Sequence, residues 1–372
     1  MNSIKIQILM TLTILLQTAA QGASLTQPEL NIGVVRPSSE SLRPYQREIE
    51  KGAEVAIETK NAQYPKLRSK INLFYLKIKG TQQGDHRAMQ KFLEKNNINL
   101  LFGGIINSEA NYIRSIIGDE KVPLISPAPQ PSIKKDNTFY SCLAVGPEGA
   151  IISKYAYEML EKRKAIIISA NEDPEEKDIV TAFEKDFHHR GGKTIAHYDH
   201  NKMPAKIIAQ SIASESPDMI LLPSHYKKAY SIIKVLREKR ILAPIFGTNK
   251  WHGRSFYNAK TNRIMSGNYF TTFFTSDDPD PVVKQFKTSF LSKYKTNPST
   301  LSAIGFDTIS MAISSFQRAD SSLLKPITKA LRNSRCTGFS SIKMTKNQLL
   351  KKAVPIMTTT ARGPVFVTRM QL

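Results

Sequence analysis

Short apolar runs alternate with amphipathic segments over most of the chain, and this alternation restricts the fold more than any other feature. The runs Leu30–Val35, Ile98–Phe102 and Val122–Ile125 have the length and composition of buried strands. Between them, Gln46–Thr59 and His86–Asn96 place apolar residues at helical spacing. Strands that alternate with helices form βαβ units, whose parallel sheet is covered by helices on both faces. We therefore predict an α/β fold with a doubly wound parallel sheet.

The same pattern starts again after residues 145–148. A helix is predicted at Gly149–Glu161 and a strand at Ala165–Ser169, and further pairs follow as far as Pro244–Gly247. A chain of 372 residues exceeds the ~250–300 residues that one core usually supports. We therefore predict two doubly wound lobes. One crossover is expected near residues 145–148, and another within the irregular stretch Phe270–Pro281.

The first residues have the pattern of a secretory signal peptide. One positive charge, Lys5, precedes the apolar run Ile6–Leu16, and small residues follow that run. A transmembrane anchor needs ~20 apolar residues, and this run is shorter. We predict that residues 1–23 are a signal peptide, cleaved after Ala20 or Ala23, and that the mature protein is exported.

The composition excludes several classes of protein. Hydrophobic residues make up 41% of the chain, which excludes a wholly disordered protein. Two cysteines are too few for a disulfide scaffold or a multi-cysteine zinc protein. In an exported protein Cys142 and Cys336 face an oxidising compartment, where a disulfide and free buried thiols are both open alternatives.

The chain is strongly basic, with 53 Lys and Arg against 31 Asp and Glu and a net charge of +22. These basic residues are scattered over predicted helix faces, and no run reaches the ~5–8 residues of a nucleic-acid-binding arm. Export also argues against a nucleic-acid partner, so we expect none. The charge still favours contact with anionic surfaces of the cell envelope.

No motif in the sequence indicates an enzyme or a cofactor. Gly191-Gly192-Lys193-Thr194 is similar to the end of a phosphate-binding loop, but Phe187 stands where that loop needs an earlier glycine. A helix that ends in glycine is the better interpretation. Gly103-Gly104 lacks the third glycine of a dinucleotide fingerprint and is better explained by close backbone approach at the mouth of a cleft.

Four histidines lie close together in the sequence, at His188, His189, His197 and His200. Zinc sites need defined ligand pairs in a rigid arrangement, and these residues fall at a predicted helix end and a predicted strand end. We predict a solvated surface here and no metal site. The sequence also contains no His-Glu-x-x-His helix and no Gly-x-Ser-x-Gly elbow, so we predict a protein that is not an enzyme.

Several stretches in order along the chain carry a resemblance to a known family. They include LNIGVV at Leu30–Val35, LLFGGIINSEA at Leu100–Ala110, VPLISPAPQP at Val122–Pro131, SPDMILL at Ser216–Leu222 and APIFGTNKW at Ala243–Trp251. From Leu30 to Val367 the chain resembles the type I periplasmic solute-binding proteins. Within them it is similar to the branched-chain amino acid (Leu/Ile/Val) receptor family of ABC transporters.

The resemblance implies two α/β lobes joined by a three-crossing hinge, with a ligand enclosed between them. Residues 24–146 and 274–347 would form the first lobe, and residues 147–273 and 348–372 the second. It also implies a periplasmic monomer without a cofactor, which delivers a small-molecule ligand to an ABC permease in the inner membrane. The strand order of such lobes places the ligand beyond the carboxyl ends of the strands.

The family's ligand-binding positions can be transferred one by one, with several departures. The candidate ligand-binding residues are Tyr45, Asn107, Ser108, Ala128, Gln130, His225 and Asn249. Asn249 stands where the family has the glutamate that pairs with the ligand's α-ammonium group. A neutral amide cannot neutralise a buried cation. Lys77 similarly occupies a place where an acidic residue often follows the second strand.

Two functions follow from this pattern. The leading hypothesis is an exported receptor that closes on a small polar ligand, which is an amino acid, an amide or a carboxylate. The alternative is an envelope partner-binding or regulatory module that has the same fold and a degenerate cleft.

Overall fold

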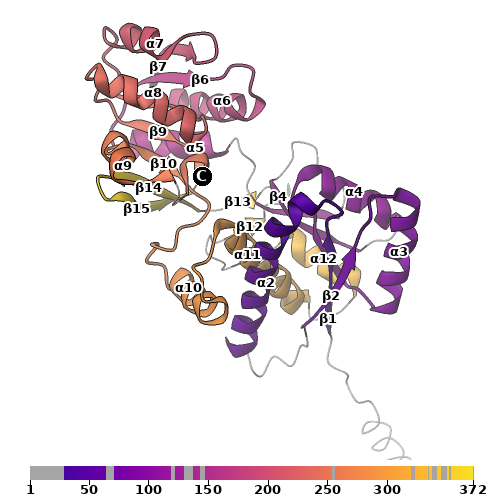
Figure 1. The fold of residues 1–372 in the computed structure, drawn as a ribbon. Coiled ribbons are helices and arrows are strands. Elements are labelled where there is room, and N and C mark those ends of the chain that lie inside the picture. Colours follow the sequence, from indigo (N-terminus) through magenta and orange to yellow (C-terminus); the bar gives the residue numbers. More distant parts are fainter. Residues whose placement is uncertain are drawn as a thin grey trace, which may run out of the picture.

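The computed structural model describes residues 29–63, 71–118, 122–129, 137–142, 147–253, 256–319, 323–333, 335–336, 342–344, 350–351 and 353–371. The predicted signal peptide lies outside these residues. Within them the chain forms two α/β lobes, each built around a mainly parallel sheet (Figure 1). The predicted fold class is therefore confirmed.

The first lobe contains a five-stranded sheet in which all strands are parallel, in the order β2-β1-β3-β4-β5. The strands are β1 (Leu30–Arg36), β2 (Ile71–Lys77), β3 (Leu100–Gly103), β4 (Leu124–Pro129) and β5 (Thr138–Cys142). Four of them correspond to predicted strands, whereas β5 was not predicted. The strand order reverses beside β1, which gives the sheet a topological switch point of the kind where ligands bind.

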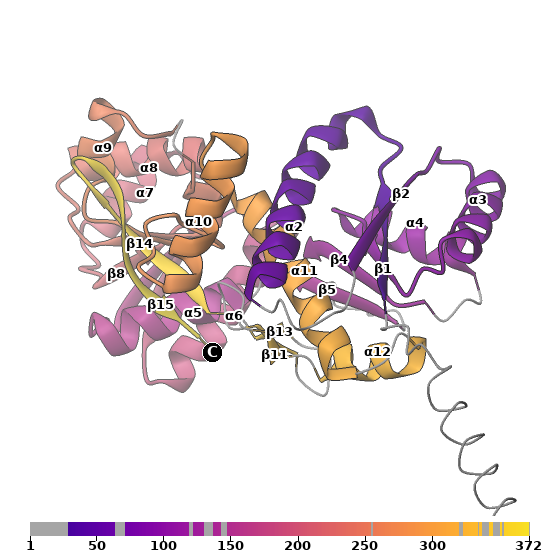
Figure 2. The ribbon, with the colours of Figure 1, turned by 90° about the horizontal axis from the view of Figure 1, so that it is seen from below.

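Helices cover both faces of this sheet. The helices α3 (Gln82–Lys95) and α4 (Asn107–Ile117) bury one face with residues such as Met89 and Ile113. The long helices α2 (Arg43–Gln63) and α11 (Thr300–Ala319) bury the other face (Figure 2). The short η1 (Glu40–Leu42) precedes α2, and α10 (Pro281–Tyr294) and α12 (Leu324–Arg332) pack against α2 and α11 respectively.

Two glycines let α2 and α11 cross in backbone contact. A Cβ atom added to Gly52 would lie 1.7 Å from the carbonyl oxygen of Ser302, and one added to Gly305 would lie 1.9 Å from that of Ile49. Glycine in a helix interior costs about 1 kcal/mol relative to alanine. The close crossing therefore offsets a local cost, because it lets two long helices bury their shared face.

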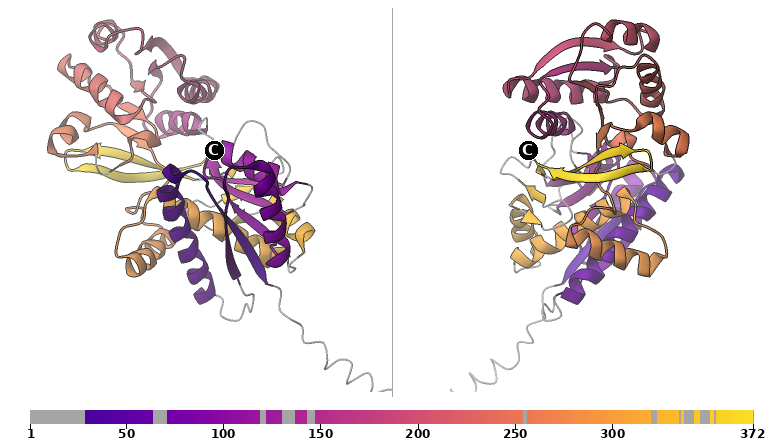
Figure 3. Two further views of the ribbon diagram at one scale, coloured as in Figure 1. Left: turned by 45° about the vertical axis from the view of Figure 1, so that its right-hand side comes forward. Right: turned by 90° about the vertical axis from the view of Figure 1, so that its left-hand side faces the viewer.

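The second lobe contains a seven-stranded sheet in the order β15-β14-β10-β9-β8-β6-β7. Its parallel part consists of β6 (Lys164–Ser169), β7 (Lys193–Asp199), β8 (Met219–Leu221), β9 (Ile245–Gly247) and β10 (Tyr269–Thr271). The strands β14 (Val354–Thr360) and β15 (Gly363–Met370) form an antiparallel hairpin at one edge, which Figure 3 shows in yellow. Neither hairpin strand was predicted.

Helices also cover both faces of the second sheet. One face packs on α5 (Pro147–Lys154) and α6 (Pro174–His189), and the other on α7 (Ala205–Ile212), α8 (Tyr226–Glu238) and α9 (Ala259–Met265). The helix predicted at Gly149–Glu161 ends earlier, because the π-helical turn η2 (Tyr155–Met159) interrupts it. Gly191 has φ +99° directly after α6, as the glycine-ended helix requires.

The chain passes between the two sheets three times. It leaves the first lobe between β5 and α5, returns between β10 and α10, and crosses again before β14. The stretch Phe270–Pro281, predicted to be irregular, begins inside β10 and then connects to α10. A small antiparallel sheet of β11 (Arg335–Cys336), β12 (Ile342–Met344) and β13 (Leu350–Lys351) precedes the last crossing. The predicted lobe boundaries remain a prediction.

Among the described helices, none combines the length and the apolar character needed to cross a lipid bilayer.

Candidate functional site

The candidate ligand residues of the first lobe lie at the carboxyl edge of its sheet. Asn107 and Ser108 begin α4, directly after β3, and Tyr45 lies in the first turn of α2, where 52% of its surface is exposed. The Oδ1 atom of Asn107 is buried and has no hydrogen-bond partner. Gly104, with φ +76°, brings the chain so close to Ala110 that an added Cβ would lie 2.6 Å from its Cα. This confirms the close backbone approach predicted after β3.

The other two first-lobe candidates are placed differently. Ala128 is fully buried in β4 and packs with Ala110 and Tyr140. Gln130 lies outside the described residues. In this structure, Tyr45, Asn107 and Ser108 are therefore the first-lobe candidates that lie at the edge with partly or fully exposed side chains.

The candidates of the second lobe lie at the carboxyl edge of the second sheet. His225 precedes α8 and is exposed, and Asn249 begins the short η3 (Asn249–Trp251) directly after β9. Both positions follow strands of the parallel part of the sheet. The two lobes thus each place polar side chains at the strand ends, as the sequence predicted for a parallel sheet.

Asn249 is held by a carboxylate that the sequence analysis did not single out. Glu148, in the first turn of α5, is fully buried. Its Oε2 accepts a hydrogen bond of 2.7 Å from Nδ2 of Asn249, and its Oε1 accepts one of 3.2 Å from the backbone N–H of Asn249. The hydroxyl of Thr271, at the end of β10, donates to Oε1 at 2.6 Å. Burial raises the pKa of Glu148, although these hydrogen bonds oppose the shift.

This arrangement determines which atom of Asn249 remains available. Because Nδ2 donates to Glu148, the amide orientation is set, and Oδ1 is left as the acceptor of the side chain. The carboxylate of Glu148 is itself saturated and has no exposed surface. The second-lobe edge therefore has an uncharged acceptor at position 249, where the resembling family has a charged one.

Charged groups surround this amide. Lys250 is nearly buried, with 6% of its side chain exposed, and its Nζ lies 3.1 Å from Oε2 of Glu175. Asp173 caps α6 by accepting from the backbone N–H groups of Glu176 and Glu175. These hydrogen bonds, led by that from Glu176, together with the charges of Lys250 and His225, lower the pKa of Asp173. The edge thus combines fixed charges of both signs.

His200 corrects one expectation. It lies at the end of β7 and is buried rather than on a solvated surface, because its Nε2 lies 2.7 Å from Oγ of Ser224 and 3.4 Å from Oε2 of Glu176. A hydrolytic Ser-His-acid relay needs the acid on the opposite ring nitrogen. Here Nδ1 is buried without a partner, so this cluster does not have the relay geometry.

The other histidines make local contacts. His188 lies 3.1 Å from the hydroxyl of Thr194, and His197 lies 3.0 Å from Oε1 of Glu184. Within the described ranges, no group of three or more His, Cys, Asp or Glu side chains is arranged to hold a metal ion.

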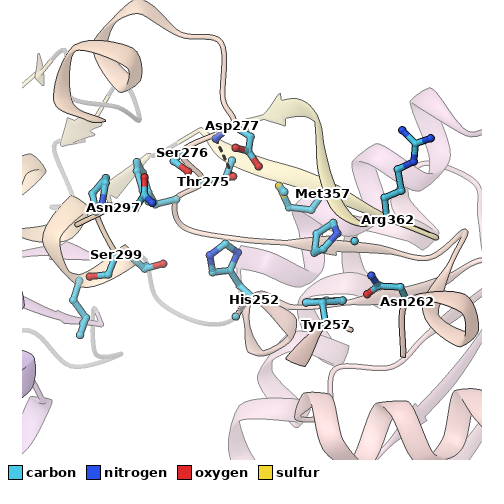
Figure 4. A pocket seen from close by; sticks show the side chains of 17 residues that line it. His252, Tyr257, Asn262, Thr275, Ser276, Asp277, Asn297, Ser299, Met357 and Arg362 are labelled. Atoms are coloured by element: carbon cyan, nitrogen blue, oxygen red, sulfur yellow. Dashed lines mark hydrogen bonds between the residues drawn. The ribbon is translucent and has the colours of Figure 1, made fainter. Parts of the chain in front are cut away.

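A cavity of about 820 Å³ lies beside this edge, next to the crossing between β10 and α10. Figure 4 shows His252 between Asn297 and Ser299 on one side and Tyr257 on the other. Its lining combines the loop before α11, the segment after η3 and the β14–β15 hairpin, and it includes none of the predicted ligand residues. Sequence reasoning missed it because these segments are far apart in the chain.

Comparison with known proteins agrees with this architecture. The family model described as periplasmic binding protein matches residues 29–363. The leucine binding protein of Thermotoga maritima has a TM-score of 0.62 at 19% identity, covering 92% of this chain and 98% of its own. A putative branched-chain amino acid ABC transporter protein of Rhodospirillum rubrum has a TM-score of 0.79 at 18% identity, covering 92% and 100%.

Other similar structures carry different ligands. A solute binding protein of an R. palustris ABC transporter, solved with benzoate, has a TM-score of 0.61 at 16% identity, covering 92% of this chain and 97% of its own. No curated protein matches the sequence. The chain therefore belongs to the periplasmic binding protein family, and its two lobes have the type I fold of the branched-chain amino acid receptors.

Proposed function

We propose that this protein is an exported, non-enzymatic solute receptor that closes on a small polar ligand and delivers it to an ABC permease in the inner membrane. The family and the two-lobed fold support a receptor role. In such a receptor, ligand binding shifts an equilibrium between open and closed arrangements of the lobes, because the ligand contacts both lobes only in the closed form.

The bond between Asn249 and Glu148 is the observation that carries the choice of ligand. An α-ammonium group in the cleft needs a carboxylate, and the nearest one is sealed behind Asn249 by its own hydrogen bonds. An uncharged acceptor suits a hydroxyl or an amide N–H instead. We infer that the ligand is a carboxylate or an amide, rather than a free branched-chain amino acid.

Thermal unfolding across a panel of ligands tests this proposal. The panel contains Leu, Ile and Val, their amides, benzoate and short aliphatic carboxylates. A ligand present at 100 times its Kd stabilises the folded state by about 2.7 kcal/mol, which raises the melting temperature measurably. We expect stabilisation by carboxylates or amides. Stabilisation by Leu, Ile and Val alone would contradict the inference from Asn249.

The variant Asn249→Glu provides the matched comparison. It restores a carboxylate at the edge, although Glu148 lies directly behind it, so the variant must first be shown to fold. We expect it to gain affinity for amino acids and to lose affinity for carboxylates. If no small molecule stabilises the natural protein and it co-purifies with an envelope protein, the partner-binding alternative replaces the receptor role.

A further inference from the structure

A separate hollow of about 330 Å³ lies on the first lobe, at the ends of β1 and β2 and the first turns of α2. We call it the first-lobe hollow. Its volume is at the lower end of the ~300–1,000 Å³ typical of ligand pockets. It contains none of the residues transferred from the family. The residues that carry the argument are Arg36, Arg43, Gln46, Arg47, Glu50 and Lys77.

The hollow has more positive than negative charge. Arg36 binds Glu50 through two hydrogen bonds, of 2.9 Å from Nε and 2.8 Å from Nη2, so that these two charges neutralise each other. Arg43 pairs with Glu40. Arg47 and Lys77 are exposed, and neither has an acidic partner among the described residues. Two cations therefore remain for an anion in the hollow.

Gln46 adds a requirement of the opposite kind. It is only 2% exposed, and its Nε2 donates to Oε1 of Glu50 at 3.1 Å. This bond sets the amide orientation, because a flipped amide would turn its oxygen toward the carboxylate. Its Oε1 is then a buried acceptor without a partner. Leaving such a group unpaired costs about 1–3 kcal/mol, so a donor from a ligand would relieve that cost.

We propose that the first-lobe hollow binds a small, free anion that carries a hydroxyl group, such as a hydroxycarboxylate. Its anionic groups contact Arg47 and Lys77, and its hydroxyl donates to Oε1 of Gln46. The site is separate from the residues of the proposed receptor cleft, so it stands or fails independently of that function. The same chemistry occurs in phosphoglycerol headgroups, but a buried acceptor suits a ligand that can enter the hollow freely.

Isothermal titration calorimetry with citrate and tricarballylate tests the proposal, because these anions differ only by one hydroxyl group. We expect citrate to bind about 10-fold more tightly, the ratio that corresponds to ~1.4 kcal/mol, or one ordinary hydrogen bond. The variant R47A/K77A should lose at least 10-fold in citrate affinity. The control K91A/K95A removes the same charge from α3, away from the hollow, and should bind citrate normally.

The variant Gln46→Met tests the hydroxyl contact. Methionine has similar length and no acceptor, so we expect citrate and tricarballylate to bind this variant equally. Its melting temperature verifies that it folds. A variant that keeps the preference for citrate overturns the role of Gln46, and equal citrate loss in K91A/K95A reduces the effect to net charge.

Two further arms separate this site from its rivals. If Asn249→Asp abolishes citrate binding while R47A/K77A retains it, citrate binds in the receptor cleft and the proposal is wrong. Sedimentation with phosphatidylglycerol vesicles tests the lipid source. Binding to vesicles without binding of free citrate overturns a site for free anions, whereas citrate binding without vesicle binding supports it.

Discussion

Buried carboxylates act in opposite ways at two residues of this protein. Asp85, in the first turn of α3, is 2% exposed and accepts hydrogen bonds from the backbone N–H groups of Lys79, Gly80 and Thr81 and from the hydroxyl of Tyr112. Burial alone would raise the pKa of Asp85, but these hydrogen bonds outweigh it and lower the pKa. Glu148 instead has a raised pKa, because burial dominates there.

The variant Asp85→Asn should destabilise the protein in a pH-dependent way. Since the pKa of Asp85 is lower in the folded state, its stabilising effect is present above the unfolded value of about 3.9 and is lost as pH falls through the folded value. We expect a loss of about 1–3 kcal/mol at pH 7 and a smaller difference near pH 3. Urea unfolding at both pH values measures it, and an equal loss at each would contradict the assignment.

Variants of Glu148 should separate hydrogen bonding from charge. Glu148→Ala leaves two donors of Asn249 and one of Thr271 unpaired, so we expect a loss of about 3 kcal/mol. Glu148→Gln can still accept from two of them and should lose less. Because the raised pKa makes ionisation costly, the natural protein should lose stability as pH rises above the unfolded carboxyl pKa, and Glu148→Gln should lack this dependence. Urea unfolding of the three proteins between pH 4 and pH 8 measures both effects.

At the scale of elements, the contact of α2 with α11 depends on glycine. Gly52→Ala places a Cβ against the backbone of Ser302, which cannot move aside as a side chain could. We expect a loss of about 3 kcal/mol despite the better helix propensity of alanine. Gly84→Ala in α3 is the matched control, because its Cβ meets only the side chain of Thr81. Thermal unfolding should show destabilisation in the first variant alone.

The elements that could be predicted are those with a strong local pattern. The parallel strands β1, β3 and β6 are short apolar runs, and α2 and α3 have clear helical spacing. The hairpin β14–β15 was not predicted, because it lies at a sheet edge and its burial alternates with exposed positions along β15. The π-helical turn after α5 was not predicted either, since its apolar pattern is still that of a helix.

At the scale of the whole molecule, the two lobes are joined only through the crossings and the contacts near them. Glu148 lies just after the first crossing, and Thr271 just before the second, so their hydrogen bond ties two hinge segments together. Asn249 is attached to the same carboxylate. Contact with a ligand at Asn249 would therefore act directly on the hinge.

Ligand binding should make the molecule more compact. Small-angle X-ray scattering with a stabilising ligand from the panel should show a smaller radius of gyration than without it. The variant Glu148→Ala should weaken this response, because the hinge contact is lost while the rest of the cleft is kept. An unchanged radius of gyration with a ligand that binds would contradict closure.

The sequence by itself determined the α/β class, the two lobes and the polar strand ends, because apolar spacing is a local property that each segment carries alone. Only the tertiary structure decided how the site is charged. Glu148 meets Asn249 across 101 residues and Thr271 across 123 residues, and Arg36 meets Glu50 between separate elements. These pairs depend on where the chain returns to the same edge. The fold was therefore predictable from pattern, whereas the chemistry of the site required the assembled lobes.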